Sequence, residues 1–196
     1  MRLSSATIIL VILLSCSNIK AQNRVVDLDD RILIGLAKTR TPTQTAAMMF
    51  LSKNYQIIEL GIPVGMLAGG IAANNKELRQ NALFVASSTA ISMGTTTLLK
   101  LIFKRRRPFI RNVKVIPIYE PTRYSFPSGH TSSSIATATA LSMAYPKWYV
   151  IAPAFAWAGA TSYSRMYLGV HHPTDVLAGI GIGVATPLAL DFMKKP

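Results

Sequence analysis

Five apolar stretches fill most of this chain after residue 56, and they constrain its fold more than any other feature. A helix that crosses a bilayer needs about 20 apolar residues, within a range of about 17–25. Several stretches are near the short end, so each alone could be a buried helix of a soluble protein. Five together are hard to bury in one small soluble domain. They are approximately Ile57–Ala73, Ala82–Phe103, Thr131–Tyr145, Trp148–Tyr163 and Val176–Met193.

Composition and connector length favour a bundle of membrane helices. Hydrophobic residues make up 50% of the 196 residues. The apolar stretches are rich in Gly, Ala, Ser and Thr, which lets membrane helices pack closely. The connectors 74–81 and Pro146-Lys147 are as short as antiparallel hairpins require. We therefore predict an all-α fold, an integral membrane helical bundle with five spans in the mature protein.

The N-terminus has the pattern of a targeting segment. The apolar run Ala6–Leu14 is shorter than a membrane span and typical of a secretory signal. We expect cleavage after Ala21, so that 1–21 is a signal peptide and 22–196 is the membrane domain. Two alternatives stay open: an uncleaved first membrane helix, which would make six spans, or a lipoprotein cleavage box at Cys16, the only cysteine.

Residues 22–54 precede the first stretch and are mixed in character. Three aspartates in 27–30 stand before the apolar run 31–36, which predicts a helix with acids in its first turn. Further apolar residues recur between Ala46 and Leu51. For these we expect an amphipathic helix lying at the membrane interface.

Positive charge is concentrated in one segment of a chain whose net charge is +13. Such a patch attracts anions, namely phosphate groups, anionic lipid headgroups or nucleic acid. It lies between apolar segments and no nucleic-acid motif accompanies it, so nucleic acid is not an expected partner. The basic residues are Lys100, Lys104, Arg105, Arg106, Arg107, Arg111, Lys114 and Arg123.

The charge pattern also predicts an orientation in the membrane. With the mature N-terminus outside, the connector 74–81, Lys147 and the C-terminal lysines are cytoplasmic, as the positive-inside tendency favours. The basic loop 104–123, His130 and the segment 164–175 then share the outer face. The loop breaks the charge rule, which indicates that its charge serves a function. We expect an inner-membrane protein with its site on the outer, periplasmic face.

The histidines identify the candidate site. All three lie in two short motifs, Pro127-Ser128-Gly129-His130 and the segment from Ser164-Arg165 through His171-His172 to Asp175. Imidazole exchanges protons near neutral pH. A helix that begins after the first motif would present free N–H groups to an anion. Ser128 can add a hydroxyl donor, and Gly129 allows the backbone to approach closely.

The second motif is the more specific one. His171 and Asp175 are four residues apart and can share a helix face, so that the carboxylate fixes the imidazole tautomer. Arg165 supplies a planar fork for phosphate oxygens. A plain helix start at His172 explains Pro173 and Asp175 but not Arg165 or His171. We therefore assign His172 a structural role, as a cap or wall.

Two further cations, Lys100 and Arg107, precede these motifs and suit a phosphate. Taken alone, they also fit a snorkelling lysine and a basic membrane flank. Metal chemistry is not expected, because among eight acidic residues only Asp175 lies within a motif. Magnesium or two-metal phosphatases need several convergent carboxylates.

Together the three elements resemble the signature of the type 2 phosphatidic acid phosphatase (PAP2) superfamily. The pattern is Lys, six residues, Arg-Pro; then Pro-Ser-Gly-His; then Ser-Arg, five residues, His, three residues, Asp. Every position is filled between residues 100 and 175. The resemblance implies that His171 is the nucleophile oriented by Asp175 and that His130 is the acid and base. It implies a phosphate held by Lys100, Arg107, Ser128, Gly129 and Arg165.

We therefore expect a membrane phosphatase that needs no metal or other cofactor and acts on lipid phosphates through a phosphohistidine. Candidate substrates are phosphatidate, phosphatidylglycerol phosphate, undecaprenyl diphosphate and lipid A phosphates. The alternatives are a phosphotransferase that uses the same site, a soluble periplasmic acid phosphatase, and a non-enzymatic protein that binds anionic lipid through 104–123. The short, membrane-like chain argues against a haloperoxidase of the same superfamily.

Overall fold

The computed structural model describes residues 24–122 and 124–194. The predictions for the signal peptide, the first membrane helix and Cys16 fall on residues outside these ranges, as does Arg123 of the basic loop. Every regular element in the described ranges is helical, which confirms the all-α prediction. A helix over 24–38 is followed by α2 (Pro42–Ala72), α3 (Lys76–Phe103), α4 (Pro108–Arg111), α5 (Gly129–Ala144), α6 (Trp148–Tyr167), α7 (Pro173–Ala189) and the 3₁₀ turn η1 (Asp191–Met193).

Helix α5 is the centre of the bundle. Every residue from Thr131 to Ala140 is buried, and α3, α6 and α7 pack around the helix. This run consists of Ser, Thr and Ala apart from Ile135, and such small residues allow close helix approach. Hydroxyl pairs join α5 to α3, with 2.7 Å between the oxygens of Thr89 and Thr137. The Thr96 and Ser132 hydroxyls form a second such pair, so part of the buried polar surface of α5 is bonded within the bundle.

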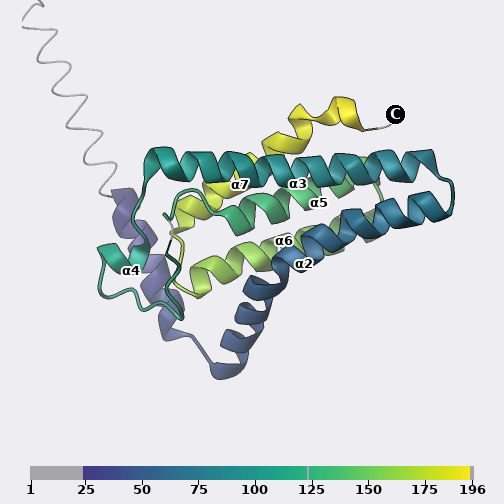
Figure 1. Cartoon of the computed structure of the whole chain (residues 1–196). Helices are drawn as coiled ribbons and strands as arrows, with labels where there is room; N and C mark the ends of the chain where they lie inside the picture. The colour runs from purple at the N-terminus through teal and green to yellow at the C-terminus, as the bar shows by residue number, and fades with distance from the viewer. Residues whose placement is uncertain (1–23, 123, 195–196) are drawn as a thin grey trace, which may run out of the picture.

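The hairpins place the three motif elements at one end of the bundle. The α2–α3 and α5–α6 connections lie at one end, while α4, the start of α5 and the start of α7 lie at the other (Figure 1). The basic loop, His130 and the segment 164–175 were predicted to lie on the same face, and this arrangement agrees with that prediction. The fold thus gathers the three sequence elements, which are separated by up to 75 positions, into one region.

The structure corrects the prediction of a separate interfacial helix between Ala46 and Leu51. These residues belong to α2, which begins at Pro42 and runs for 31 residues. No Gly or Pro occurs in 52–56 to end a helix there, so the helix continues into the apolar stretch. Figure 1 shows α2 bent along its length, and Pro63 inside it cannot donate to the carbonyl of Glu59.

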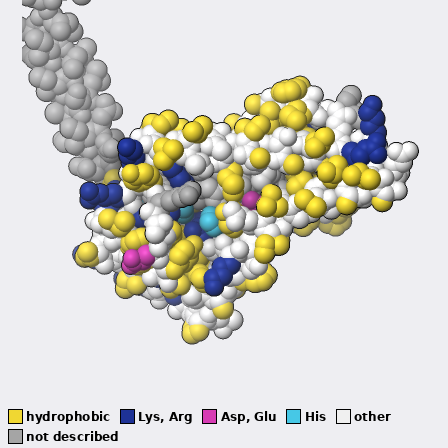
Figure 2. All heavy atoms as spheres, viewed as in Figure 1, with side chains coloured by type: hydrophobic (Ala, Val, Ile, Leu, Met, Phe, Trp, Pro, Cys, Tyr) yellow, Lys and Arg dark blue, Asp and Glu magenta, His cyan; other side chains and the backbone are white. Residues whose placement is uncertain are grey.

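Two described helices are long and apolar enough to cross a membrane by length and composition: α2 and the helical stretch Lys76–Arg111 that begins with α3. Helix α7 is apolar but shorter, with 17 residues. Apolar side chains cover much of the visible outer surface of the bundle (Figure 2). Those exposed on α2 and α3 include Ile57, Leu60, Val64, Ile71, Leu98, Leu101 and Ile102. Apolar surface of this extent fits contact with lipid.

Candidate active site

A cavity of about 400 Å³ lies beside the start of α5 and is walled by α2, α3 and the loop after α4. Six of the eight predicted site residues line it: Lys100, Arg107, Gly129, His130, Arg165 and His171. The other two, Ser128 and Asp175, are fully buried and are not among the lining residues. Figure 2 shows histidine and basic side chains together in a hollow of this surface. The structure thus brings the predicted residues into one place.

His171 and Asp175 meet, but not on a shared helix face. His171 lies in the loop before α7, and His172 is the N-cap of that helix. Asp175, in the first turn, places Oδ2 at 3.5 Å from His171 Nδ1. The predicted shared helix face is therefore wrong, because His171 precedes the helix, although the two side chains are neighbours. The capping role predicted for His172 is confirmed, because its backbone N–H donates to Asp175 Oδ2 at 2.9 Å.

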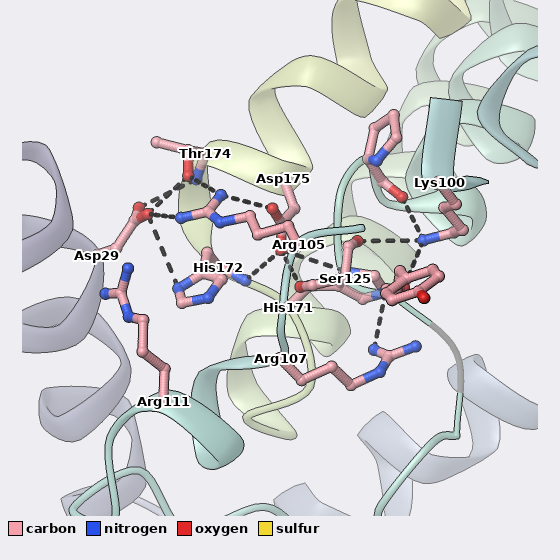
Figure 3. A network of polar contacts seen from close by, with 12 residues as sticks. Asp29, Lys100, Arg105, Arg107, Arg111, Ser125, His171, His172, Thr174 and Asp175 are labelled. Carbon is pink, nitrogen blue, oxygen red and sulfur yellow. Dashed lines mark hydrogen bonds and ion pairs between the residues drawn. The ribbon is translucent and has the colours of Figure 1, made fainter. Parts of the chain in front are cut away.

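Donors from three different segments hold the Asp175 carboxylate (Figure 3). Arg105 Nη1 donates to Oδ1 at 2.6 Å, and the Ser125 hydroxyl donates to Oδ2. With the His172 N–H these contacts satisfy both oxygens of a side chain that solvent does not reach. A buried carboxylate supplied with charged and neutral donors is stable as an anion. It is therefore fixed in place beside His171.

His171 is a neutral imidazole in this setting. Burial lowers its pKa from 6.5 to about 3, and Arg165 and Arg107 act in the same direction while Asp175 opposes them. With Asp175 facing Nδ1, the Nδ1 atom carries the hydrogen and Nε2 keeps its lone pair. Nε2 lies 3.4 Å from Arg107 Nη1. The nitrogen with the lone pair therefore lies next to a cation that can hold a phosphoryl group.

The three site cations are fixed by acceptors that sequence spacing does not reveal. Lys100 Nζ donates to the carbonyls of Tyr124, Ser125 and Pro127 at 3.0, 3.1 and 2.5 Å, rather than reaching along the membrane flank. Arg107 donates to the carbonyl of Val170 at 2.6 Å. Burial lowers the pKa of Arg107 to about 10, which still leaves it charged at neutral pH.

Arg165 is buried and held from two sides by groups outside the motifs. Its Nη1 donates to the Ser52 hydroxyl of α2, and its Nη2 donates to the Tyr119 hydroxyl at 2.7 Å. The Ser52 and Tyr119 oxygens are themselves 3.2 Å apart. Helix α2 and the loop after α4 thus share the task of orienting this guanidinium.

His130 is also positioned by α2. Its Nε2 lies 3.2 Å from the carbonyl oxygen of Ser52, and its ring stacks on Tyr55 with centroids 3.7 Å apart. A carbonyl oxygen only accepts, so Nε2 carries the hydrogen in the neutral ring. Nδ1 is then the atom that can take up and release a proton.

Ser128 and Gly129 begin α5 as the sequence predicted. Ser128 is the N-cap, its N–H donates to the backbone carbonyl of Asp175 at 3.0 Å, and its hydroxyl accepts from Thr131 at 2.9 Å. A Cβ placed on Gly129 would meet only a methyl group of Thr96, at 3.7 Å. The space next to Gly129 on the cavity side is therefore open to a ligand.

Six residues that support the motif side chains were not predicted as site residues from the sequence. These are Asp29, Ser52, Tyr55, Arg105, Tyr119 and Ser125. Arg105 was noted only as part of the basic patch, and Asp29 only as an acid in a first helical turn. What marks these residues is that they are polar and buried. The sequence alone does not distinguish a buried polar residue from an exposed one, so it carried no signal for them.

Comparison with known proteins gives a consistent family. The family model of the PAP2 superfamily matches residues 81–192. An undecaprenyl-diphosphatase of Sulfolobus acidocaldarius is 34% identical over 72% of this chain and 66% of its own length. A lipid A 4'-phosphatase of Porphyromonas gingivalis is 30% identical over 56% of this chain and 50% of its own length. The chain thus spans about half to two thirds of these relatives.

Solved structures agree with the overall fold. The transmembrane PAP2 type phosphatidylglycerolphosphate phosphatase from Bacillus subtilis superposes with a TM-score of 0.74 at 25% identity, covering 88% of this chain and 89% of that one. LpxE of Aquifex aeolicus superposes with a TM-score of 0.62 at 24% identity, covering 81% and 92%. The region matched by the family model includes all three motifs, since 100–175 lies within 81–192. The chain belongs to the PAP2 superfamily.

Proposed function

We propose that this protein is a membrane phosphatase that hydrolyses lipid phosphate monoesters or diphosphates through a phosphohistidine on His171. The observation that carries the proposal is a cavity in which His171, with Asp175 next to its Nδ1 atom, lies close to several fixed cations. Lys100, Arg107 and Arg165 all line that cavity. Cations held in place before the reaction stabilise the charge of a transferring phosphoryl group.

The first chemical step transfers the phosphoryl group to the enzyme. His171 Nε2 attacks phosphorus, and the bond between phosphorus and the lipid oxygen breaks. Protonated His130 gives its proton to that leaving oxygen, which departs as an alcohol, or as a phosphate monoester from a diphosphate. Asp175 stabilises the positive charge that develops on the His171 ring.

The second step returns the enzyme to its starting state. Water attacks the phosphorus of phosphohistidine while His130, now neutral, accepts one of its protons. The phosphorus–nitrogen bond breaks, inorganic phosphate is released, and His171 regains its lone pair. In both steps Lys100, Arg107 and Arg165 hold phosphoryl oxygens, with the Ser128 hydroxyl and the Gly129 N–H at the start of α5 as further donors.

The donor set of the cavity favours this metal-free route. Among the described residues that line it, none is an aspartate or glutamate, and the charged groups are cations. Magnesium and calcium sites are built from oxygen ligands with several carboxylates. A cavity with this lining attracts a phosphate and repels a divalent cation.

The position of the cavity supports a lipid substrate. It is at one end of a bundle with apolar outer faces, so a lipid tail can stay in the bilayer while its headgroup reaches Lys100 and Arg107. We place five spans in the inner membrane with this end on the periplasmic side. The candidate substrates remain phosphatidate, phosphatidylglycerol phosphate, undecaprenyl diphosphate and lipid A phosphates. The similar proteins include phosphatases named for three of these four.

The test is phosphate release from a panel of these lipids by the protein purified in detergent, with EDTA present throughout. Wild type and His171→Ala are compared on each lipid and on a soluble phosphate ester. Release by wild type alone supports the proposal and ranks the substrates. Loss of activity in EDTA that Mg²⁺ restores would refute the metal-free route, and full activity of His171→Ala would refute the nucleophile.

A further inference from the structure

The helix over 24–38 lies outside the segment matched by the family model, yet it reaches the candidate site through one buried carboxylate. We propose that Asp29 and Arg105 form a positioning pair that holds Asp175, and through it His171, in the reactive arrangement. This inference rests on the proposed roles of His171 and Asp175. It adds two residues to the site: Asp29, which lies outside the three motifs, and Arg105, which is one of the six unspecified residues between Lys100 and Arg107.

The Arg105 guanidinium bridges two buried carboxylates (Figure 3). Its Nη1 donates to Asp175 Oδ1 at 2.6 Å, and its Nη2 donates to Asp29 Oδ2 at 2.9 Å. The side chains of Asp175 and Asp29 are 0% and 2% exposed. An arginine fork engaged at both ends fixes its own plane and the carboxylates that it bonds.

Asp29 also holds the start of α7 directly. Its Oδ1 accepts from the backbone N–H of Thr174 at 3.1 Å, and its Oδ2 accepts from the Thr174 hydroxyl at 2.6 Å. The first N–H groups of a helix have no partner within the helix, and a carboxylate there is stabilised by the helix dipole. Asp29 therefore caps, from a distant segment, the same helical turn that carries Asp175.

The charges explain why a second carboxylate serves the reaction. Arg105 alone would neutralise Asp175 and reduce its attraction for a positive charge on His171. The Asp29 carboxylate partly neutralises the positive charge of Arg105. More of the negative field of Asp175 therefore remains to stabilise the imidazole as it becomes charged during phosphoryl transfer. The pair therefore favours the transition state more than the bound substrate, and its loss should lower kcat rather than raise KM.

Neighbouring acids on the same helix provide matched controls. Asp27 is exposed. Asp30 docks the helix through Arg111, at 3.1 Å, and Asn112, at 2.8 Å, without contacting Asp175. Asp30→Asn thus removes a docking contact of the helix but leaves the bridge to Asp175. The three variants Asp27→Asn, Asp29→Asn and Asp30→Asn change the same charge on one helix.

The experiment measures kcat and KM of these variants in detergent on a lipid phosphate that wild type hydrolyses, with His171→Ala as the reference for the proposed function. We expect Asp29→Asn to lower kcat about 10-fold or more, as for loss of a hydrogen bond to a charged group, with KM within about twofold. Asp27→Asn and Asp30→Asn should stay close to wild type. The unfolding temperature of each variant shows whether the bundle is intact.

A double-variant cycle tests the route through Arg105. Because the two residues act as a unit, Asp29→Asn combined with Arg105→Lys should cost little more than Arg105→Lys alone. Equal kcat for Asp29→Asn and Asp27→Asn, with His171→Ala inactive, would overturn the inference and leave the proposed function standing. A loss in Asp30→Asn as large as in Asp29→Asn would also overturn it, since docking alone would then account for the effect. Full activity of His171→Ala would instead refute the proposed function itself, on which this inference rests.

Discussion

The chemistry of the site depends on which nitrogen of each histidine is engaged. Asp175 faces Nδ1 of His171, and the Ser52 carbonyl faces Nε2 of His130. In the proposed mechanism, these contacts leave Nε2 of His171 to attack phosphorus and Nδ1 of His130 to exchange the proton. His172, although adjacent to His171, is fully buried at the N-cap of α7. Two neighbouring imidazoles thus have different surroundings and different expected roles.

Replacement of each histidine separates these roles. His171→Ala should abolish turnover, because the covalent route is lost with the nucleophile. His172→Ala should retain most of the kcat, because the N–H that binds Asp175 belongs to its backbone. Phosphate release by both variants, measured at equal protein amounts, checks this. Activity in His171→Ala together with inactivity in His172→Ala would move the nucleophile to His172.

The burial of His171 predicts an acid-sensitive stability. Its pKa is 6.5 when unfolded and about 3 when folded, so between these values the unfolded chain binds more protons. Stability should therefore fall as pH drops below about 6.5, by roughly 1 kcal/mol per pH unit from this residue. Unfolding temperatures in detergent at pH 5 and pH 7 should differ less for His171→Gln than for wild type. An equal difference in both would show that His171 does not contribute.

At the scale of elements, the close contact between α5 and α7 sets the geometry of the site. The N-terminus of α5 carries Gly129 and His130, and that of α7 carries Asp175. Two glycines of α7 lie against α5: a Cβ on Gly179 would be 2.8 Å from the Ser128 carbonyl oxygen, and one on Gly183 would be 2.7 Å from that of Ser132. The absence of side chains there permits the approach.

This packing predicts a contrast between two glycines of one helix. Gly183→Ala forces a methyl group against the α5 backbone, which should destabilise the bundle by about 1–3 kcal/mol. Gly181→Ala has open space and should be neutral or stabilising by up to about 1 kcal/mol. Thermal unfolding of both variants in the same detergent is the measurement. A Gly183→Ala variant as stable as Gly181→Ala would contradict the packing.

The sequence predicted these elements unevenly, for physical reasons. Long apolar stretches predicted the bundle helices, because length and hydropathy are local properties. The fusion of Ala46–Leu51 with α2 was missed, since an amphipathic segment and the end of a longer helix have the same local pattern. The motifs supplied the predicted site residues by spacing. Their supports, such as Asp29 and Tyr119, could not be predicted, because they depend on contacts between distant segments.

At the scale of the whole molecule, the site and the short hairpins lie at opposite ends of the bundle (Figure 1). If the bundle spans the inner membrane, the two ends face different compartments. The connector 74–81 carries Lys76 and Arg79 and suits the cytoplasmic side. The basic loop 104–123 then lies outside, where the proposed substrates present their phosphates.

Cysteine labelling in intact cells tests this orientation. Lys114 and Lys76 are exposed residues, one in the basic loop and one at the opposite end of the bundle. In a Cys16→Ser background, Lys114→Cys should react with a thiol reagent that does not cross the inner membrane, and Lys76→Cys should react only after lysis. The reverse pattern would place the site in the cytoplasm.

The most direct test of the central claim is capture of the phosphoenzyme. Wild-type protein is mixed with a lipid phosphate that it hydrolyses, quenched within milliseconds under alkaline conditions that preserve phosphohistidine, digested and examined by mass spectrometry. The account predicts a phosphate on the peptide that contains His171, at that residue, and none in His171→Ala. Phosphate on another residue, or turnover by His171→Ala without any phosphoenzyme, would contradict it.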